Sequence, residues 1–342
     1  MRISAWCRVM VSLCGASALL TACGSGSQPS AALPQADTAA SGGAPLMAPN
    51  NIGRSAPHTV RASWMSPDAK RKALLYTTNA NDGTVFAYSY PKGTMEGELT
   101  GFEEPYGDCT NKAGDVWIAD DLASTITEYA HGGSTPIRTL SDSGEYPAGC
   151  AIDPKTGNLA VMNYETTSRG PGGVSIYRKA KGKPKTYTDG AITRGWFCSY
   201  DTGGNLFLDG DRSGSSGFQL AELPRGSSTF TNISINQSIV VPGGVQWDGK
   251  YVAVADENGP GNGAMYQFSV SGSTGTLAST TTLDSSQNVH QFWIDTSHSR
   301  VVVPSASLGT VGYWKFPAGG NPTESFSGFS FPESVAFSAA RK

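Results

Sequence analysis

The chain has 342 residues and few charged side chains, 15% against about 25% in an average globular protein. Its formal net charge is −3, so Lys and Arg are not in excess. Proteins that bind nucleic acid concentrate Lys and Arg on one face, and this composition offers no such surface. We therefore expect no nucleic-acid partner. The apolar share of 38% is enough for a full core over this length.

Long hydrophobic runs are also missing. After residue 20 no run of about 18 apolar residues occurs, so the sequence predicts no transmembrane helix. The apolar run from Val9 to Leu20 is too short to span a bilayer stably, and Arg2 and Arg8 precede it. This pattern is typical of an export signal.

The segment Leu20-Thr21-Ala22-Cys23 resembles the bacterial lipobox. The resemblance implies that residues 1–22 are a lipoprotein signal peptide and that Cys23 carries the lipid, palmitate among its acyl chains. An ordinary signal peptide that happens to end near a Cys is the alternative. Gly24 is not the Asp that favours inner-membrane retention in the enteric sorting rule. We expect an exported, lipid-anchored protein, in the outer membrane if the source is Gram-negative.

Residues 23–70 predict a lipidated Cys followed by a disordered tether, because Ser, Ala, Gly and Pro dominate there without apolar periodicity. Trp64 and Met65 near its end are expected to dock against the domain that follows. The folded domain is predicted to cover residues 71–342.

Cysteine is scarce beyond the signal. Removal of residues 1–22 and lipidation of Cys23 leave Cys109, Cys150 and Cys198, an odd number. Because these three occupy similar places in repeated segments, we aligned them at equivalent positions of neighbouring strands. The alignment predicts three buried, reduced and unpaired thiols that serve as small apolar side chains.

Helical periodicity is absent, since no window of 11 or more residues keeps apolar spacing of three and four without Gly or Pro. Instead, short β-rich runs end in turn residues at positions 111, 153, 201, 248, 295 and 338, which lie 42 to 48 residues apart. That period fits one four-stranded propeller blade. The sequence therefore predicts an all-β, six-bladed β-propeller.

Both ends of the folded part contribute to one predicted blade. The first β-rich run, Leu74 to Asn79, has the pattern of a second strand, whereas the last, Ser330 to Ser338, has that of a first strand. We therefore expect the C-terminal strand to pair with the N-terminal blade and close the ring.

The segment from Pro147 to Asn163 combines Pro-x-Gly-Cys-x-Ile-Asp with Gly-Asn-Leu-Ala-Val. It resembles the NHL-repeat group of six-bladed propellers, and gluconolactonase-like propellers share the layout. The resemblance extends over residues 71 to 338 and implies a fold rather than an activity.

Gluconolactonase-type and paraoxonase-type propellers hold a divalent metal with Glu, Asn and Asp from different inner strands. Glu333, which follows Pro332, resembles the Glu of that pattern. The positions that would supply Asn or Asp carry small residues instead: Ala148, Gly149, Gly243 and Gly244. We therefore predict no metal and no cofactor.

The candidate site is one mouth of the central channel, where loops entering the inner strands meet loops leaving the second strands. Aligned on the cysteines, one row of inner-strand residues is Gly107, Ala148, Trp196, Gly243, His290 and Glu333. The next row is Asp108, Gly149, Phe197, Gly244, Gln291 and Ser334. His290 and Glu333 are predicted neighbours, acting as a structural pair, in ligand recognition or in catalysis.

Further residues near the mouth extend this prediction. Tyr106, Tyr146, Arg194 and Trp196 can stack on a glycan or peptide, or else plug the channel. The second strands end in a ring of short polar side chains: Asn79, Asp120, Asn163, Asp209 or Asp211, Asp256 and Ser305. Such residues close turns by binding nearby backbone N–H groups, and as a ring they would form an acidic rim.

Two function classes follow from these patterns. The first is a non-enzymatic, lipid-anchored scaffold that binds an envelope protein, a peptide or a glycan at the channel mouth. The second is a metal-assisted lactonase or lyase-like enzyme of the gluconolactonase type that uses Glu333, His290 and Asp108.

Overall fold

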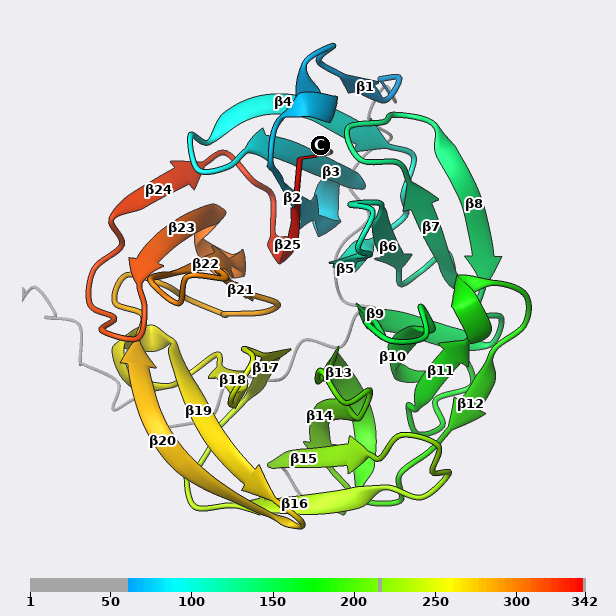
Figure 1. The fold of residues 1–342 in the computed structure, drawn as a ribbon, viewed down its shortest axis with the longest axis vertical. Coiled ribbons are helices and arrows are strands. Elements are labelled where there is room, and N and C mark those ends of the chain that lie inside the picture. The colour runs from blue at the N-terminus through cyan, green and yellow to red at the C-terminus, as the bar shows by residue number, and fades with distance from the viewer. Residues whose placement is uncertain (1–60, 215–216, 341–342) are drawn as a thin grey trace, which may run out of the picture. The chain divides into compact units, whose positions relative to one another are not determined.

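The computed structural model describes residues 61–214 and 217–340, which form β-sheets arranged around a ring (Figure 1). The predicted lipobox and most of the predicted tether lie outside the described residues. Within the described part of the chain, no helix is long and apolar enough to cross a membrane. The helices there are short 3-10 turns: η2 (Ala69–Arg71), η3 (Ala80–Asp82), η4 (Arg178–Ala180), η5 (Pro260–Asn262) and η6 (Ala306–Leu308).

The first sheet combines strands from both ends of the described chain. Its order is β1-β4-β3-β2-β25, with β1 (Trp64–Met65), β4 (Thr94–Thr100), β3 (Thr84–Ser89), β2 (Leu74–Asn79) and β25 (Pro332–Ser338). β25 is antiparallel to β2, with Thr77 opposite Val335. In Figure 1 the red C-terminal strand lies beside the blue N-terminal one. The predicted pairing of the C-terminal strand is therefore confirmed.

Two four-stranded antiparallel sheets follow along the chain. One contains β5 (Pro105–Thr110), β6 (Val116–Asp120), β7 (Thr125–Tyr129) and β8 (Pro136–Ser141). The next contains β9 (Glu145–Ile152), β10 (Leu159–Thr166), β11 (Val174–Tyr177) and β12 (Lys185–Tyr187). Each runs from its innermost strand outward in chain order, which is the layout of a propeller blade.

An eight-stranded sheet comes next, and it consists of two runs of four strands. The first run is β13 (Ile192–Tyr200), β14 (Leu206–Arg212), β15 (Phe218–Leu223) and β16 (Thr231–Ile235). The second is β17 (Pro242–Trp247), β18 (Val252–Asp256), β19 (Ala264–Ser271) and β20 (Thr274–Thr282). The outer strands β16 and β20 pair in parallel over Ser234–Ile235 and Thr274–Gly275, which joins the runs edge to edge.

The last sheet holds β21 (Trp293–Ile294), β22 (Arg300–Ser305), β23 (Thr310–Lys315) and β24 (Glu324–Ser327). Its inner edge is hydrogen-bonded to β25 through the backbones of Gln291, Glu333 and Val335. The structure is thus an all-β propeller with four-stranded blades, and its core lies between successive blades.

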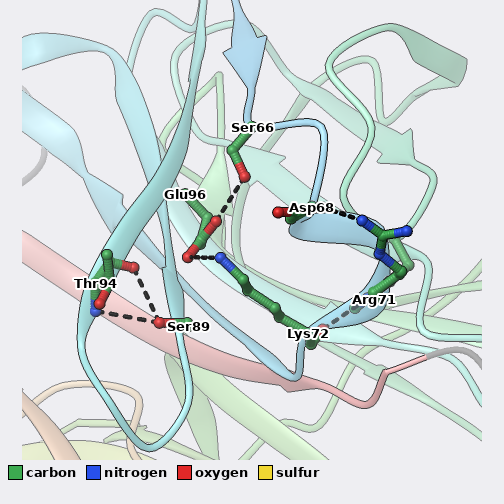
Figure 2. A network of polar contacts seen from close by, with 8 residues as sticks. Ser66, Asp68, Arg71, Lys72, Ser89, Thr94 and Glu96 are labelled. Carbon is green, nitrogen blue, oxygen red and sulfur yellow. Dashed lines mark hydrogen bonds and ion pairs between the residues drawn. The ribbon is translucent and has the colours of Figure 1, made fainter.

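The folded part begins before residue 71, where the sequence analysis placed its start. Trp64 and Met65 form β1, which pairs with β4, so the predicted docking of these two residues is confirmed. Figure 2 shows how the following turn is held: the buried Glu96 carboxylate accepts hydrogen bonds from Ser66 and from Lys72, each at 2.6 Å. Burial raises the pKa of Glu96, but the bonds from Lys72 and Ser66 and the Lys72 charge outweigh it and hold that pKa below its usual range. This stabilisation is therefore present at neutral pH and is lost as the pH falls through the lowered pKa.

The prediction of three unpaired thiols is wrong. Cys109 and Cys150 form a disulfide, with their Cα atoms 5.6 Å apart, and only Cys198 is a free cysteine among the described residues. Cys198 is buried, as expected.

The error comes from the alignment of the inner strands. Cys150 on β9 lies opposite Val161, two residues before Asn163 at the end of the predicted second strand. On β5 the equivalent residue is Asp108, because it lies opposite Ile118, which is two residues before Asp120. Cys109 is the next residue along the strand, so it is not equivalent to Cys150. Successive residues of a strand point to opposite faces, so a shift of one residue reverses the direction of the side chain.

This shift brings the two sulfur atoms together. Cys150 faces the β5–β8 blade, while Cys109, on the opposite strand face, points toward the β9–β12 blade. Both belong to the apolar cluster between these blades, together with Trp117 and Val161. The disulfide therefore links two neighbouring blades through their inner strands.

We expect Cys109→Ser, Cys150→Ser or the double variant to lower the free energy of unfolding by about 2–4 kcal/mol, because the bridge closes a loop of 41 residues. Denaturant titration measures this loss, and Cys198→Ser is the control for removal of a buried sulfur that is not bridged. Mass-spectrometric mapping of alkylated thiols in the unfolded, non-reduced protein should label Cys198 and spare the other two. Full labelling of all three without reductant would contradict the bridge.

Candidate functional site

The inner strands share a start signal that fixes their true alignment. Four of them have a Pro at or near their start, opposite the polar end of the second strand; the pairs are Pro105 with Asp120, Pro147 with Asn163, Pro242 with Asp256 and Pro332 with Asn79. Val289, which bridges to Ser305, takes the same place before β21. Alignment on these residues, rather than on the cysteines, places Tyr106 and not Gly107 in the first row of the predicted site.

The corrected first row, which we call the mouth row, consists of Tyr106, Ala148, Trp196, Gly243, His290 and Glu333. Its large members meet across the centre of the ring. The Tyr106 ring centroid lies 6.0 Å from that of His290 and 6.2 Å from that of Trp196, although the three residues come from blades that are not adjacent. Phe197, in the second row, lies 6.2 Å from Tyr106 and 6.5 Å from His290.

These four side chains are all buried and form an aromatic plug: Tyr106, Trp196, Phe197 and His290. The sequence allowed these aromatic residues either to stack on a ligand or to plug the channel. Their contacts with one another correspond to a plug.

His290 is held between two buried carboxylates. Its Nδ1 contacts Glu333 directly, and its Nε2 lies 3.1 Å from Oε1 of Glu257. The Asn288 amide donates a hydrogen bond of 3.1 Å to the other oxygen of Glu257. Burial lowers the pKa of His290, but the charges and hydrogen bonds of Glu257 and Glu333 outweigh it and raise the pKa well above its usual value. The raised pKa favours the imidazolium form of His290 at neutral pH, in contact with two acids.

The pairing of His290 with Glu333 had been predicted from the sequence, but Glu257 had not. Glu257 is one of three equivalent acids, each five residues after the first residue of a second strand: Asp121 after β6, Asp211 on β14 and Glu257 after β18. The doublets Asp120-Asp121 and Asp256-Glu257 are the sequence signal for these positions. We call Asp121, Asp211 and Glu257 the second-strand acids.

The three second-strand acids differ in their partners. Glu257 faces His290, and Asp211 accepts a 3.4 Å hydrogen bond from Trp196 Nε1 and lies 3.8 Å from the Arg194 guanidinium. Both carboxylate oxygens of Asp121 are buried without a hydrogen-bond partner. Burial, followed by the charges of Glu104 and Asp120, raises the pKa of Asp121 well above its usual value.

The polar residues that end the second strands serve as turn closers. Asp120 accepts backbone N–H groups of Glu103 and Glu104, and Asp256 accepts those of Val240 and Val241. Asn79 and Asp209 likewise accept N–H groups from Ser330 and Phe197. For Asn79, Asp120 and Asp256 this is the local role that the sequence predicted, whereas the side-chain oxygens of Asn163 and Ser305 accept no hydrogen bond within the described chain.

The remaining predicted site residues lie around the plug. Arg194 stacks over the Tyr164 ring at 5.3 Å, and Tyr146 packs against the apolar cluster that contains Trp196. Gln291 binds across the channel to the backbone of Asp108 through both ends of its amide. Asp108 is fully buried, and in the corrected alignment it is the residue that follows the second row. Its side chain is turned toward Ser334 of β25.

No group of three or more His, Cys, Asp or Glu side chains within residues 61–214 and 217–340 is arranged to hold a metal ion. Two of the acids near the mouth, Glu257 and Glu333, come from different blades, and both contact His290.

The loops on the mouth side carry exposed apolar residues. Leu122 directly follows Asp121, Leu308 lies in η6 after β22, and Val240 precedes β17; their exposed fractions are 39%, 48% and 62%. We call Leu122, Val240 and Leu308 the apolar rim. These three aliphatic side chains are exposed in loops at the same end of the ring, where they can contact a partner.

The opposite end of the ring has a hollow of about 630 Å³ between the loops that follow β5 and β9. It is lined by Thr110–Ala113 and Ile152–Gly157. The sequence predicts no site at this end, and none of the aromatic plug residues lines the hollow.

In the corrected alignment Gly107 takes the place of Asp108 in the second row, and close approach of the inner strands explains the glycines there. A Cβ atom on Gly107 would lie 2.3 Å from the Ala148 carbonyl oxygen and 2.8 Å from the Gly149 Cα. We expect Gly107→Ala to lower the free energy of unfolding by about 1–3 kcal/mol, because the β5 and β9 backbones must separate. Gly190→Ala, where nothing lies within 4 Å of the new Cβ, is the matched control. Equal stability of the two variants in denaturant titrations would contradict this packing.

No protein-family model and no curated protein matches this sequence. Among solved structures, a chain from the "Crystal structure of Nidogen/Laminin Complex" is similar, with a TM-score of 0.64 and 11% identity, covering 79% of this chain and 100% of that one. A protein of unknown function from Bacteroides caccae has a TM-score of 0.59 and 11% identity, with 78% and 99% covered. At this identity the likeness concerns the fold alone, and it supports a β-propeller.

Proposed function

We propose that this chain is a lipid-anchored envelope scaffold whose propeller binds a partner polypeptide on the mouth face. The observation that carries the proposal is the apolar rim of Leu122, Val240 and Leu308, which lies on the same end of the ring as the buried, charged mouth row. A surface with apolar contacts around a polar centre has the layout of a protein interaction site. The plugged channel favours binding on this face over passage through the ring.

The proposal takes the two halves of the eight-stranded sheet as separate blades, which gives six blades of the NHL or gluconolactonase-like kind. Both halves run outward from an inner strand, as the other sheets do, and only their outermost strands pair. Anchorage rests on the lipobox-like segment ending at Cys23, which lies outside the described residues.

The metal-assisted hydrolase is the weaker proposal. It needs Asp108 beside His290 and Glu333, but the Asp108 side chain is turned toward Ser334 at a different level of the channel. His290 is already engaged by carboxylates on both ring nitrogens. An imidazole in that state is not available as a metal ligand or general base.

A photo-crosslinking amino acid in the mouth loops tests the scaffold function. Placed in cells at Leu122 or Leu308, it should capture one partner polypeptide at both positions. Placed at Ile137, which is 48% exposed on the outer strand β8, it should not capture that partner. Capture from Ile137 alone, or no common partner from the two mouth positions, would overturn the proposal.

Lipid anchorage leads to a separate prediction. Cys23→Ala should abolish palmitate incorporation and leave the chain unprocessed or released from membranes, because no other residue follows the apolar run at the lipidation position. Metabolic labelling with a palmitate analogue and membrane fractionation measure this, with Cys198→Ala as the control. Undiminished labelling of the Cys23→Ala protein would exclude Cys23 as the lipid site.

A further inference from the structure

Asp121 differs from the two other second-strand acids in having no partner. Glu257 faces His290 and Asp211 faces Trp196 and Arg194, whereas neither oxygen of Asp121 has a hydrogen-bond partner in the described chain. Its side chain is fully buried. Ionisation of a buried carboxyl group without a hydrogen bond or a countercharge is costly, and a cation from outside the chain would remove that cost.

The mouth row explains why Asp121 has no partner. Glu257 follows β18, and the mouth-row residue of the next blade is His290, which supplies a cation. Asp121 follows β6, and the mouth-row residue of the next blade is Ala148, which is buried and has neither charge nor hydrogen-bonding side chain. His290 thus supplies a cation to Glu257, whereas Ala148 supplies none to Asp121.

Other acids increase the negative charge at this place. The Asp121 carboxyl lies within electrostatic reach of Glu104, Glu165 and Glu333, which come from segments on both sides of it. Glu104 is itself buried and has an unpartnered Oε1 atom. The ion pairs of the described chain in this region engage Glu165, through Arg169, and Asp211, through Arg194, rather than Asp121.

We propose that Asp121 and Glu104 receive the ammonium or guanidinium group of a Lys or Arg side chain from the bound partner polypeptide. This inference rests on the proposed function and adds the chemistry that the mouth recognises. The buried position of both acids selects a cation at the end of a long, thin side chain, whose methylenes can pass the apolar Leu122 next to Asp121. A paired charge-assisted hydrogen bond would replace the partner that Ala148 does not provide.

Three short peptides test the proposal by calorimetric titration of the folded chain at pH 8. They have the form Gly-Gly-X-Gly-Gly, with X as Lys, Arg or acetyl-lysine, and blocked ends. We expect the Lys or Arg peptide to bind at least tenfold more tightly than the acetyl-lysine peptide, which keeps the length and lacks the charge. Butylamine and Ca²⁺ serve as probes of a free amine and of a metal ion; tighter binding of either than of the peptides would overturn the assignment to a polypeptide side chain.

Asp121→Asn should weaken binding of the charged peptide at least tenfold, and Glu104→Gln should weaken it in the same direction. Glu98→Gln, which removes a charge on β4 away from the mouth, is the matched control and should have no effect. Binding of the charged peptide that is equal in all four proteins would overturn the role of Asp121 and Glu104. If crosslinks from Leu122 and Leu308 still capture the partner in that case, only this inference fails and the proposed function stands.

Discussion

Truncation of the chain after Gly328 is expected to abolish cooperative unfolding of the whole propeller. The truncation removes β25, which is the innermost strand of the N-terminal sheet and pairs with β2 from Leu74 to Asn79. It also removes Glu333, the direct partner of His290, and Val335 from the apolar cluster between the first and last sheets. In a closed ring each blade packs against two others, so the loss of one inner strand exposes two interfaces and a free sheet edge.

Calorimetry and near-ultraviolet circular dichroism measure the effect of this truncation. Truncation after Ala340, which leaves β25 complete, is the control and should unfold as the full chain does. A single sharp melting transition of the Gly328-truncated protein at the temperature of the full chain would show that ring closure contributes little to stability.

The propeller could be predicted because its signal is repeated along the chain. A spacing of 42 to 48 residues between similar β-rich runs does not depend on the exact limits of any strand, and the terminal strand could be assigned from its sequence pattern. The structure bears out the pairing of β25 with β2 and the four-stranded blades.

The candidate site required a finer register than the repeat provides. Alignment on Cys109, Cys150 and Cys198 displaced β5 by one residue, which hid the disulfide and replaced Tyr106 with Gly107 in the mouth row. The prolines near the start of four inner strands would have given the correct register, because each lies opposite the polar end of a second strand.

Two of the three second-strand acids, Asp121 and Glu257, were missed for a different reason. The sequence pattern pointed to Asp120 and Asp256, which close turns, and gave no separate signal for the acids that follow them, Asp121 and Glu257. Consecutive acids look alike in a sequence, and only the fold shows that one binds backbone amides while the next is turned toward the channel. The sequence could not show that Asp121 lacks a partner, because this depends on its position beside Ala148 from another blade.

The buried acids lead to the second large effect, a fall in stability as the pH rises from about 5 to 8. Burial raises the pKa of Glu104 to about 8, with the charges of Glu333 and Asp120 acting in the same direction. Burial likewise raises the pKa of Asp108 to about 8, against hydrogen bonds that lower it. The unfolded chain loses these protons near pH 4, so between pH 4 and 8 the folded state binds more protons than the unfolded state.

Between these pH values, each carboxyl group that is protonated only in the folded state makes the free energy of unfolding fall by about 1.4 kcal/mol per pH unit. From pH 5 to 8 the fall is about 4 kcal/mol for each group. The raised pKa of His290 acts in the same direction above its unfolded value of about 6.5, because the stabilisation by its charge is lost as the pH rises through the folded pKa.

Denaturant titrations at pH 5, 6.5 and 8 measure the slope, and Glu104→Gln should reduce it and stabilise the protein at pH 8. Glu98→Gln on β4 is the control and should keep the slope of the unmodified protein. A stability that stays constant over this range would mean that the acids of the mouth are already ionised in the folded protein at pH 5 and have cationic partners, which would also remove the basis for a cation at Asp121.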